Sequence, residues 1–165
     1  MCLEQSEESI NITEFKKLFD ENKKYVFAIA LSILRDFELA EDVLQEVYIK
    51  LFQQMKYQEI SNVKAWLITV SRTKALDQYR KKKREITGLD SDYFERLECI
   101  LEDPLEKLVL SKYLELLDQE ERQIVIMKGI MGMKHREIAN IVDIPLGTAI
   151  WKYNAAIKKL RKNIG

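Results

Sequence analysis

The chain has 165 residues, 47% of them apolar, which suits one ordinary domain or two small ones and argues against a wholly disordered protein. Only five glycines and two prolines are present, which argues against a turn-rich β protein and favours long helices. The 27 basic and 27 acidic residues cancel to a net charge of zero, but they are unevenly distributed along the chain.

Charge alternates along the chain in four blocks. The net charge is −5 over residues 1–63, +7 over 64–84, −9 over 85–121 and +7 over 122–165. Two separate basic blocks indicate contact with a polyanion at two places. The alternative is that solvated helix faces happen to cluster in the sequence.

The first residues, MCLEQSEESINITEF, are acidic and polar, and they do not have the character of a signal peptide. No apolar run is long enough to span a bilayer. Cys2 and Cys99 lie far apart without metal-like spacing, so we expect free thiols. These features predict a cytoplasmic protein without a membrane segment.

Apolar residues at helical spacing predict a first helix within residues 14–34, followed by a break at 35–37. Asp36 is the expected N-cap of a second helix over about 38–56. Residues 56–62 are polar and loop-like. All of this favours an all-α fold.

A third helix is predicted over about 63–83, with Ser61 or Asn62 as its cap. It contains most of the first basic block. Trp66 shares a face with the apolar residues of this helix, so we expect it to pack in the core.

Residues 84–104 are acidic and only weakly patterned, which predicts a linker between two domains, residues 1–83 and residues 105–165. Asp103 and Pro104 have the pattern of an N-cap followed by proline at the first helical position.

Helices are then predicted over about 105–117 and 119–130. Asp118 and Glu121 form a capping-box-like pattern at the start of the second of these helices.

The clearest motif is a pair of short helices, expected over about 134–142 and 146–162. Ala139 is small enough for close helix packing, and Asp143 stands where the turn needs a residue that tolerates positive φ. Ile144 provides an apolar plug under the turn. This is a helix-turn-helix pattern, whose second helix enters the DNA major groove. A plain αα-hairpin is the alternative.

In such a motif, bases are contacted from the first half of the second helix. The candidates there are Thr148, Trp151, Lys152, Asn154 and Ala155. The residues better placed for phosphates are Lys158, Lys159, Arg161 and Lys162. Trp151 is equally consistent with a core position.

A second candidate site lies on the helix predicted over 38–56. The apolar stripe of this helix is Leu39, Val43, Val47 and Leu51. Asp42, Gln45 and Glu46 are spaced i, i+3, i+4 opposite this stripe, and Ile49 lies among them. An apolar side chain framed by polar groups has the character of a small protein-docking patch. A solvated helix face is the alternative for the carboxylates.

Three stretches together resemble the extracytoplasmic-function class of bacterial RNA polymerase sigma factors. They are AEDVLQEVYIKLF at 40–52, VKAWLITVSRTKALDQYRKKKR at 63–84, and EIANIVDIPLGTAIWKYNAAIKKL at 137–160. They occur in the family's order, and the resemblance covers nearly the whole chain from about residue 12.

The resemblance implies a promoter-specificity subunit that binds core RNA polymerase and promoter DNA. The residues implied in polymerase binding are Asp42, Gln45, Glu46 and Ile49. Those implied at the minus-ten element are Arg72, Tyr79, Arg80 and Lys83. Those implied at the minus-thirty-five element are Thr148, Trp151, Lys152, Asn154, Lys158 and Lys159. Loop 56–62 would hold a flipped base.

An anti-sigma partner is a further expectation of the resemblance. No cofactor, metal or catalytic activity is expected. The sequence departs from the family pattern at Thr73, where many members have Asn. It also departs at Ile150 and Ala155, where many have Arg or Lys, so Lys152 is the only charge in the first half of the recognition helix.

Two rival functions remain at this point. A stand-alone helix-turn-helix regulator would use 135–162 but would not need the polymerase patch. A helical nucleotide pyrophosphatase would need clustered carboxylates, which Glu38, Glu41 and Asp42 faintly resemble, but a second cluster nearby is missing from the sequence. His135 has no Cys or His partner at metal-ligand spacing.

Overall fold

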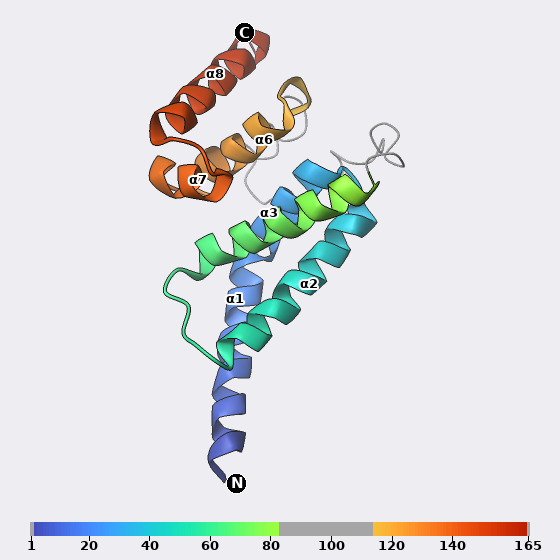
Figure 1. The fold of residues 1–165 in the computed structure, drawn as a ribbon, viewed down its shortest axis with the longest axis vertical. Coiled ribbons are helices and arrows are strands. Elements are labelled where there is room, and N and C mark those ends of the chain that lie inside the picture. The colour runs from blue at the N-terminus through green and yellow to red at the C-terminus, as the bar shows by residue number, and fades with distance from the viewer. Residues whose placement is uncertain (1, 83–113, 165) are drawn as a thin grey trace.

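The computed structural model describes residues 2–82 and 114–164, which form helices and short connections with no strand in these two ranges (Figure 1). The all-α class predicted from the sequence is therefore confirmed. The predicted linker, Lys83 and residues 105–113 of the helix expected over about 105–117 lie outside the described residues. The described end of that expected helix contains a 3₁₀ turn at Leu114–Leu116 and no α-helix.

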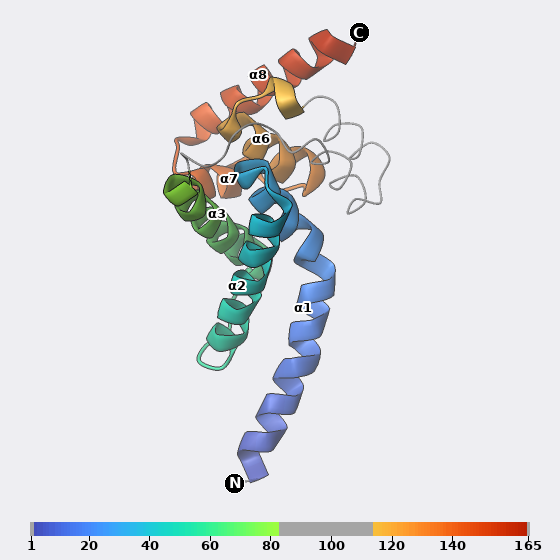
Figure 2. The same cartoon turned by 90° about the vertical axis from the view of Figure 1, so that its right-hand side faces the viewer.

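The first three helices form one bundle. They are α1 (Cys2–Leu34), α2 (Phe37–Met55) and α3 (Val63–Lys82). The second half of α1 is almost completely buried from Val26 to Leu34, whereas its N-terminal part extends away from the bundle (Figure 2). Val43, Val47 and Leu51 of α2 are fully buried against it, as the apolar spacing predicted.

Local side-chain caps set the ends of these helices. Arg35 adopts a left-handed φ of 51° after the last residue of α1. Asp36 then accepts a hydrogen bond from the backbone N–H of Leu39 at 3.0 Å, which confirms its predicted role as the N-cap of α2. At the start of α3, Asn62 Oδ1 accepts from the Ala65 N–H at 3.1 Å, so Asn62 is the cap.

The second group of elements begins with the 3₁₀ turn η2 (Leu114–Leu116) and α6 (Gln119–Val125). A single α-helix was predicted over 119–130, but the chain continues from α6 as the π-helical segment η3 (Ile126–Ile130). There the Met131 N–H donates to the Ile126 carbonyl at 3.0 Å, an i→i+5 bond in place of the α-helical i→i+4 bond.

The helix-turn-helix prediction is confirmed by α7 (His135–Val142) and α8 (Leu146–Ile164). Asp143 adopts the left-handed conformation between them, with φ 59° and ψ 52°. The Ile144 N–H donates to the Ala139 carbonyl at 3.0 Å, which closes the end of α7. Ala139 is 4% exposed, as the close packing of two short helices requires.

The two groups of helices are docked on one another. Helix α6 lies against α1, and α7 lies across α3 (Figure 1). Their buried side chains form one continuous apolar cluster that includes Ile29 and Leu67 of the first group and Ile124 and Met127 of the second. The surface of α3 that faces α7 is therefore partly covered by the helix-turn-helix group.

The capping box at Asp118 gives a stability prediction. Asp118 accepts from the Glu121 N–H at 2.8 Å, and Glu121 accepts from the Asp118 N–H at 3.3 Å. Asp118→Ala is expected to lower the free energy of unfolding by about 1 kcal/mol, because it leaves an N–H of the first turn without its acceptor. Urea denaturation measures this loss, and Glu115→Ala, on a neighbouring exposed carboxylate, is the control.

The stabilisation that the Asp118 cap gives to the fold depends on pH. Burial alone would raise the pKa of Asp118, but hydrogen bonds involving Glu121, together with Lys152 and Lys159, outweigh burial and lower this pKa below 3.8. A carboxylate with a depressed folded-state pKa stabilises the fold above its unfolded pKa, and this stabilisation is lost as the pH falls through the folded value. An Asp118→Ala penalty as large at pH 2 as at pH 7 would contradict this assignment.

Candidate protein and nucleic-acid interfaces

The predicted docking patch lies on the exposed side of α2. Asp42, Gln45, Glu46 and Ile49 are all exposed, and the Ile49 side chain is 59% accessible although it is apolar. Glu46 lies 3.4 Å from the Lys74 ammonium of α3, an ion pair that is half open to solvent. The four side chains therefore form a free surface, in which an apolar centre is surrounded by polar groups.

Helix α3 presents only part of its basic face to solvent. Arg80, Lys81 and Lys82 are exposed at its end, and Arg80 lies 3.4 Å from Asp77. Tyr79 is partly buried and packs against the core. The end of α3 is therefore a positively charged surface with one partly buried aromatic ring beside it.

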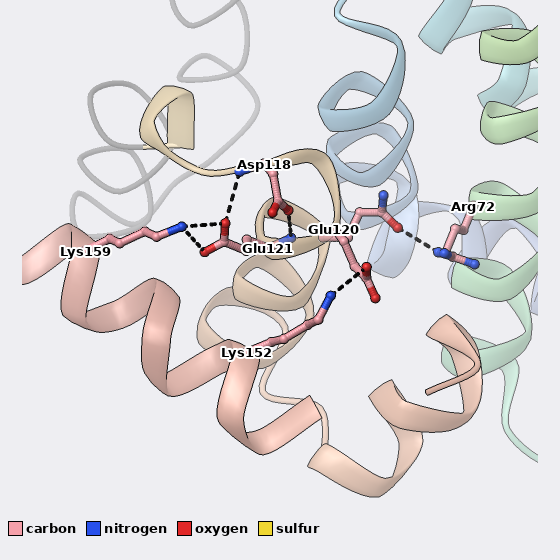
Figure 3. A network of polar contacts seen from close by, with 7 residues as sticks. Arg72, Asp118, Glu120, Glu121, Lys152 and Lys159 are labelled. Carbon is pink, nitrogen blue, oxygen red and sulfur yellow. Dashed lines mark hydrogen bonds and ion pairs between the residues drawn. The ribbon is translucent and has the colours of Figure 1, made fainter. Parts of the chain in front are cut away.

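Arg72 lies at the contact between the two groups of helices. Its Nε donates to Gln123 Oε1 of α6 at 2.6 Å (Figure 3). A terminal nitrogen donates to the Ile141 carbonyl of α7 at 3.3 Å. Burial lowers the pKa of the guanidinium from its ordinary value, and Glu120 acts in the opposite direction. In this arrangement the Arg72 side chain therefore contacts the second group of helices.

Further polar contacts join the same two groups. Lys64 Nζ donates to the Met131 carbonyl at 2.7 Å, and Asn62 Nδ2 donates to Glu137 Oε1 at 3.2 Å. On the other side, Arg122 donates to the Ser32 carbonyl at 3.5 Å and is 7% exposed. The contacts are spread over α1 and α3, so the docked arrangement rests on many small polar contributions as well as on apolar burial.

Two lysines of the predicted recognition helix α8 are paired within the protein. Lys152 Nζ lies 2.9 Å from Glu120 Oε2, and Lys159 Nζ lies 2.8 Å from Glu121 Oε1 (Figure 3). These hydrogen bonds raise the pKa of both lysines. Because both lysines are turned toward α6, they lie on the flank of α8 and not on its outward face.

The outward face of α8 contains the other predicted contacts. Trp151 is 68% exposed, so the alternative that it packs in the core is wrong. Asn154 and Lys158 are also exposed, whereas Thr148 is half-buried. The buried positions Ala149, Ala156 and Leu160 define the opposite face, and this spacing was the sequence signal that could have placed Trp151 outside.

Sequence reasoning missed four contributors to these surfaces. Gln123 and the carboxylates Glu120 and Glu121 were not singled out as partners, because their contacts join residues 32 to 51 positions apart. Ile150 was noted only as a departure from a family pattern, yet its side chain is 37% exposed beside Trp151.

The α2–α3 loop borders a small cavity of about 200 Å³ next to α1, lined by Glu14, Leu18, Met55, Gln58, Glu59, Ile60 and Val63. Tyr57 in this loop is 86% exposed. Trp66, by contrast, packs partly buried against the apolar core, as its spacing predicted. The loop thus presents an aromatic ring to solvent next to a partly enclosed space.

Within residues 2–82 and 114–164, no group of three or more His, Cys, Asp or Glu side chains is arranged to hold a metal ion. None of the helices in those ranges combines the length and apolar character needed to cross a membrane.

Comparison with known proteins gives matches to both parts of the chain. Residues 18–85 match the family Sigma-70 region 2, and residues 107–160 match Sigma-70, region 4. The ECF RNA polymerase sigma factor EcfG of Rhodopseudomonas palustris is 29% identical over 136 residues, covering 81% of this chain and 75% of EcfG. SigM of Bacillus subtilis, also an ECF RNA polymerase sigma factor, is 28% identical over 123 residues, covering 72% of this chain and 76% of SigM.

Solved structures share the fold. The sigma factor RpoE of Bartonella quintana, crystallised with the anti-sigma factor NepR, superposes with a TM-score of 0.68 at 23% identity, covering 90% of this chain and 95% of RpoE. CnrH, in complex with the cytosolic domain of CnrY, gives a TM-score of 0.67 at 19% identity, covering 97% and 93% of the two chains.

Proposed function

The chain belongs to the extracytoplasmic-function class of bacterial RNA polymerase sigma factors, and from this premise we propose how its described surfaces divide the work of promoter recognition. The α2 patch binds core polymerase, α3 and the preceding loop engage the minus-ten element, and α8 binds upstream duplex at the minus-thirty-five element. The observation that carries this assignment is the patch on α2, where Ile49 stays 59% exposed between Asp42, Gln45 and Glu46.

The patch supports polymerase binding because a stand-alone DNA-binding regulator has no use for it. The patch lies on the face of α2 opposite the buried stripe, so a partner can cover it without disturbing the fold. An exposed apolar side chain ringed by polar groups is the usual composition of a small binding hot spot. The rest of the patch supplies the polar rim that such a contact needs.

At the minus-ten element, Arg80 supplies a charge and Tyr79 a ring, and Lys83 belongs to the same stripe by sequence. Positive charges that follow the backbone, next to a ring that stacks on a base, suit a partly single-stranded target. The exposed ring of Tyr57 and the cavity beside the α2–α3 loop suit the capture of an unstacked base.

Arg72 can join this surface only after it leaves Gln123 and Ile141. We therefore assign the docked arrangement to a state that precedes promoter binding. Contact of α3 with the minus-ten element then requires α7 to move away from α3. We infer that the chain divides into domains at 1–83 and 105–165 and that this movement separates the two domains.

In this mechanism the chain acts through binding alone, in the cytoplasm where polymerase works, and the chemistry of RNA synthesis belongs to polymerase. An anti-sigma factor is the regulatory partner that we propose for it. Both the RpoE and CnrH structures were solved with a partner chain, which supports this assignment by analogy.

The direct test is reconstitution. The purified full chain is mixed with bacterial core RNA polymerase, and the complex is isolated by size-exclusion chromatography and supplied with a library of genomic promoter fragments. The expected result is a stable complex that starts transcription at a defined set of sites, which core polymerase alone does not use. Sequence-specific DNA binding without any association with core polymerase would identify a stand-alone regulator instead.

A further inference from the structure

The outward face of α8 changes in chemistry along its length. Gly147, Ile150, Asn154 and Lys158 follow one another at spacings of three or four residues. Trp151 lies four residues after Gly147 and three before Asn154, so all five share one face of the helix. All five are exposed. The apolar residues come first, the amide follows, and the positive charges of Lys158, Arg161 and Lys162 come last.

The first part of this face is apolar and uncovered. Leu146 is 40% exposed, Ile150 37% and Trp151 68%. A side chain added at Gly147 would meet nothing within 4 Å, so packing inside the protein does not account for a glycine there. The fold therefore leaves a small apolar surface at the start of the recognition helix, the part of a helix-turn-helix that faces base edges.

The charged alternatives for base contact are directed elsewhere. Lys152, the one charged residue in the first half of α8, lies 2.9 Å from Glu120, and Lys159 is held by both carboxylate oxygens of Glu121 at 2.8 and 3.0 Å. The side chains left to face the DNA at the base-contacting end are thus Ile150, Trp151 and Asn154.

The major groove offers one apolar group, the C5-methyl of thymine, and apolar side chains contact it specifically. We propose that Ile150 and Trp151 select thymines in the minus-thirty-five element by contacting the C5-methyl groups of those thymines. Asn154, one turn further along, is suited to the paired N6 and N7 groups of adenine. The basic end of the same face fixes the helix on the phosphates. This inference rests on the proposed function, because it requires α8 to lie in the major groove of upstream DNA.

Replacing thymine by deoxyuridine removes only the methyl group, so it gives a direct test. A minus-thirty-five element is first selected from duplexes randomised upstream of a fixed minus-ten sequence, using the full chain bound to core polymerase. Each thymine is then replaced singly by deoxyuridine, and the dissociation constant is measured. We expect about a fourfold loss of affinity at one or more thymines, the fold-change that corresponds to about 0.8 kcal/mol for one buried methyl.

Substitutions in α8 test which residues cause the loss of affinity for deoxyuridine duplexes. The deoxyuridine penalty should disappear in Ile150→Ala or Trp151→Ala, whose exposed side chains can be shortened without loss of folding, as circular dichroism would verify. Lys158→Ala is the matched control on the same face, and it should weaken thymine and deoxyuridine duplexes equally. Equal binding of both duplexes by the wild type at every position would overturn the proposal, and so would an unchanged penalty in both variants.

The failure of this inference can be told from failure of the proposed function. A chain that directs promoter-specific initiation but ignores the thymine methyls contradicts only the inference. A chain that forms no complex with core polymerase contradicts the proposed function itself, and the selection step would then give no promoter.

Discussion

The double substitution Glu46→Lys, Ile49→Ala is expected to weaken binding to core polymerase by about 2 kcal/mol or more, which is about 30-fold in the dissociation constant. Ile49 is the apolar centre of the α2 patch, and Glu46 is one of its carboxylates, so the variant removes the contact and reverses a charge at the same place. The measurement is a fluorescence anisotropy titration of the labelled chain with core polymerase.

The fold should survive this change. Both side chains are exposed, and the Glu46–Lys74 ion pair that is lost is of the solvent-exposed kind that contributes at most about 1 kcal/mol. The matched control is Glu21→Lys, Ile12→Ala on α1, which changes an exposed glutamate and an isoleucine that is 55% exposed. Equal weakening by both double variants would show a general charge effect and would remove the specific role of the patch.

The second large effect is expected from preventing α7 from leaving α3. Asn62 Nδ2 and Glu137 Oε1 lie 3.2 Å apart across this contact. In a background with Cys2→Ser and Cys99→Ser, the pair Asn62→Cys and Glu137→Cys can be joined by a short bis-maleimide that contains an internal disulfide. Promoter-dependent transcription should fall to the level of core polymerase alone, because the linked chain cannot present α3 to the minus-ten element while α7 covers it.

Reversibility provides the control for this experiment. Adding a reductant cleaves the linker and should restore transcription, and the Glu137→Cys single variant treated with the same reagent should stay active throughout. Full activity of the linked chain would mean that the docked arrangement is itself compatible with promoter opening, and the assignment of Arg72 to DNA would then fail.

Features that depend on a few adjacent residues were predictable from the sequence. Asp36, Asp118 and Asp143 were each predicted in the role that they have, because a cap or a left-handed turn is decided by side chains within three or four positions. The helix-turn-helix and the burial of the α2 stripe follow from spacing in the same way. The patch on α2 was also predictable as a surface, since it is the complement of that stripe.

The docking of the two groups of helices was not predictable, because it depends on partners that are distant in sequence. Nothing near Arg72 in the chain indicates that Gln123 and the Ile141 carbonyl will bind it. Ion pairs between the charge blocks were not predictable for the same reason. The blocks were treated as independent, whereas Glu120 and Glu121 at the end of the third block bind Lys152 and Lys159 of the fourth. The π-helical turn after Val125 had no recognised sequence signal.

The two ion pairs of α8 affect how strongly added salt should lower the affinity of the protein for DNA. Binding to duplex DNA releases condensed counterions in proportion to the number of phosphates that the protein neutralises. Each neutralised phosphate adds about 0.9 to the slope with which the logarithm of the binding constant falls as the logarithm of the salt concentration rises. Lys152 and Lys159 are already neutralised by Glu120 and Glu121, and Arg122 is buried. Three of the nine basic residues in 122–165 are therefore not available to neutralise phosphates. Upstream binding by this chain should therefore be less salt-sensitive than its basic residues suggest, and a larger share of it should come from shape and apolar contact.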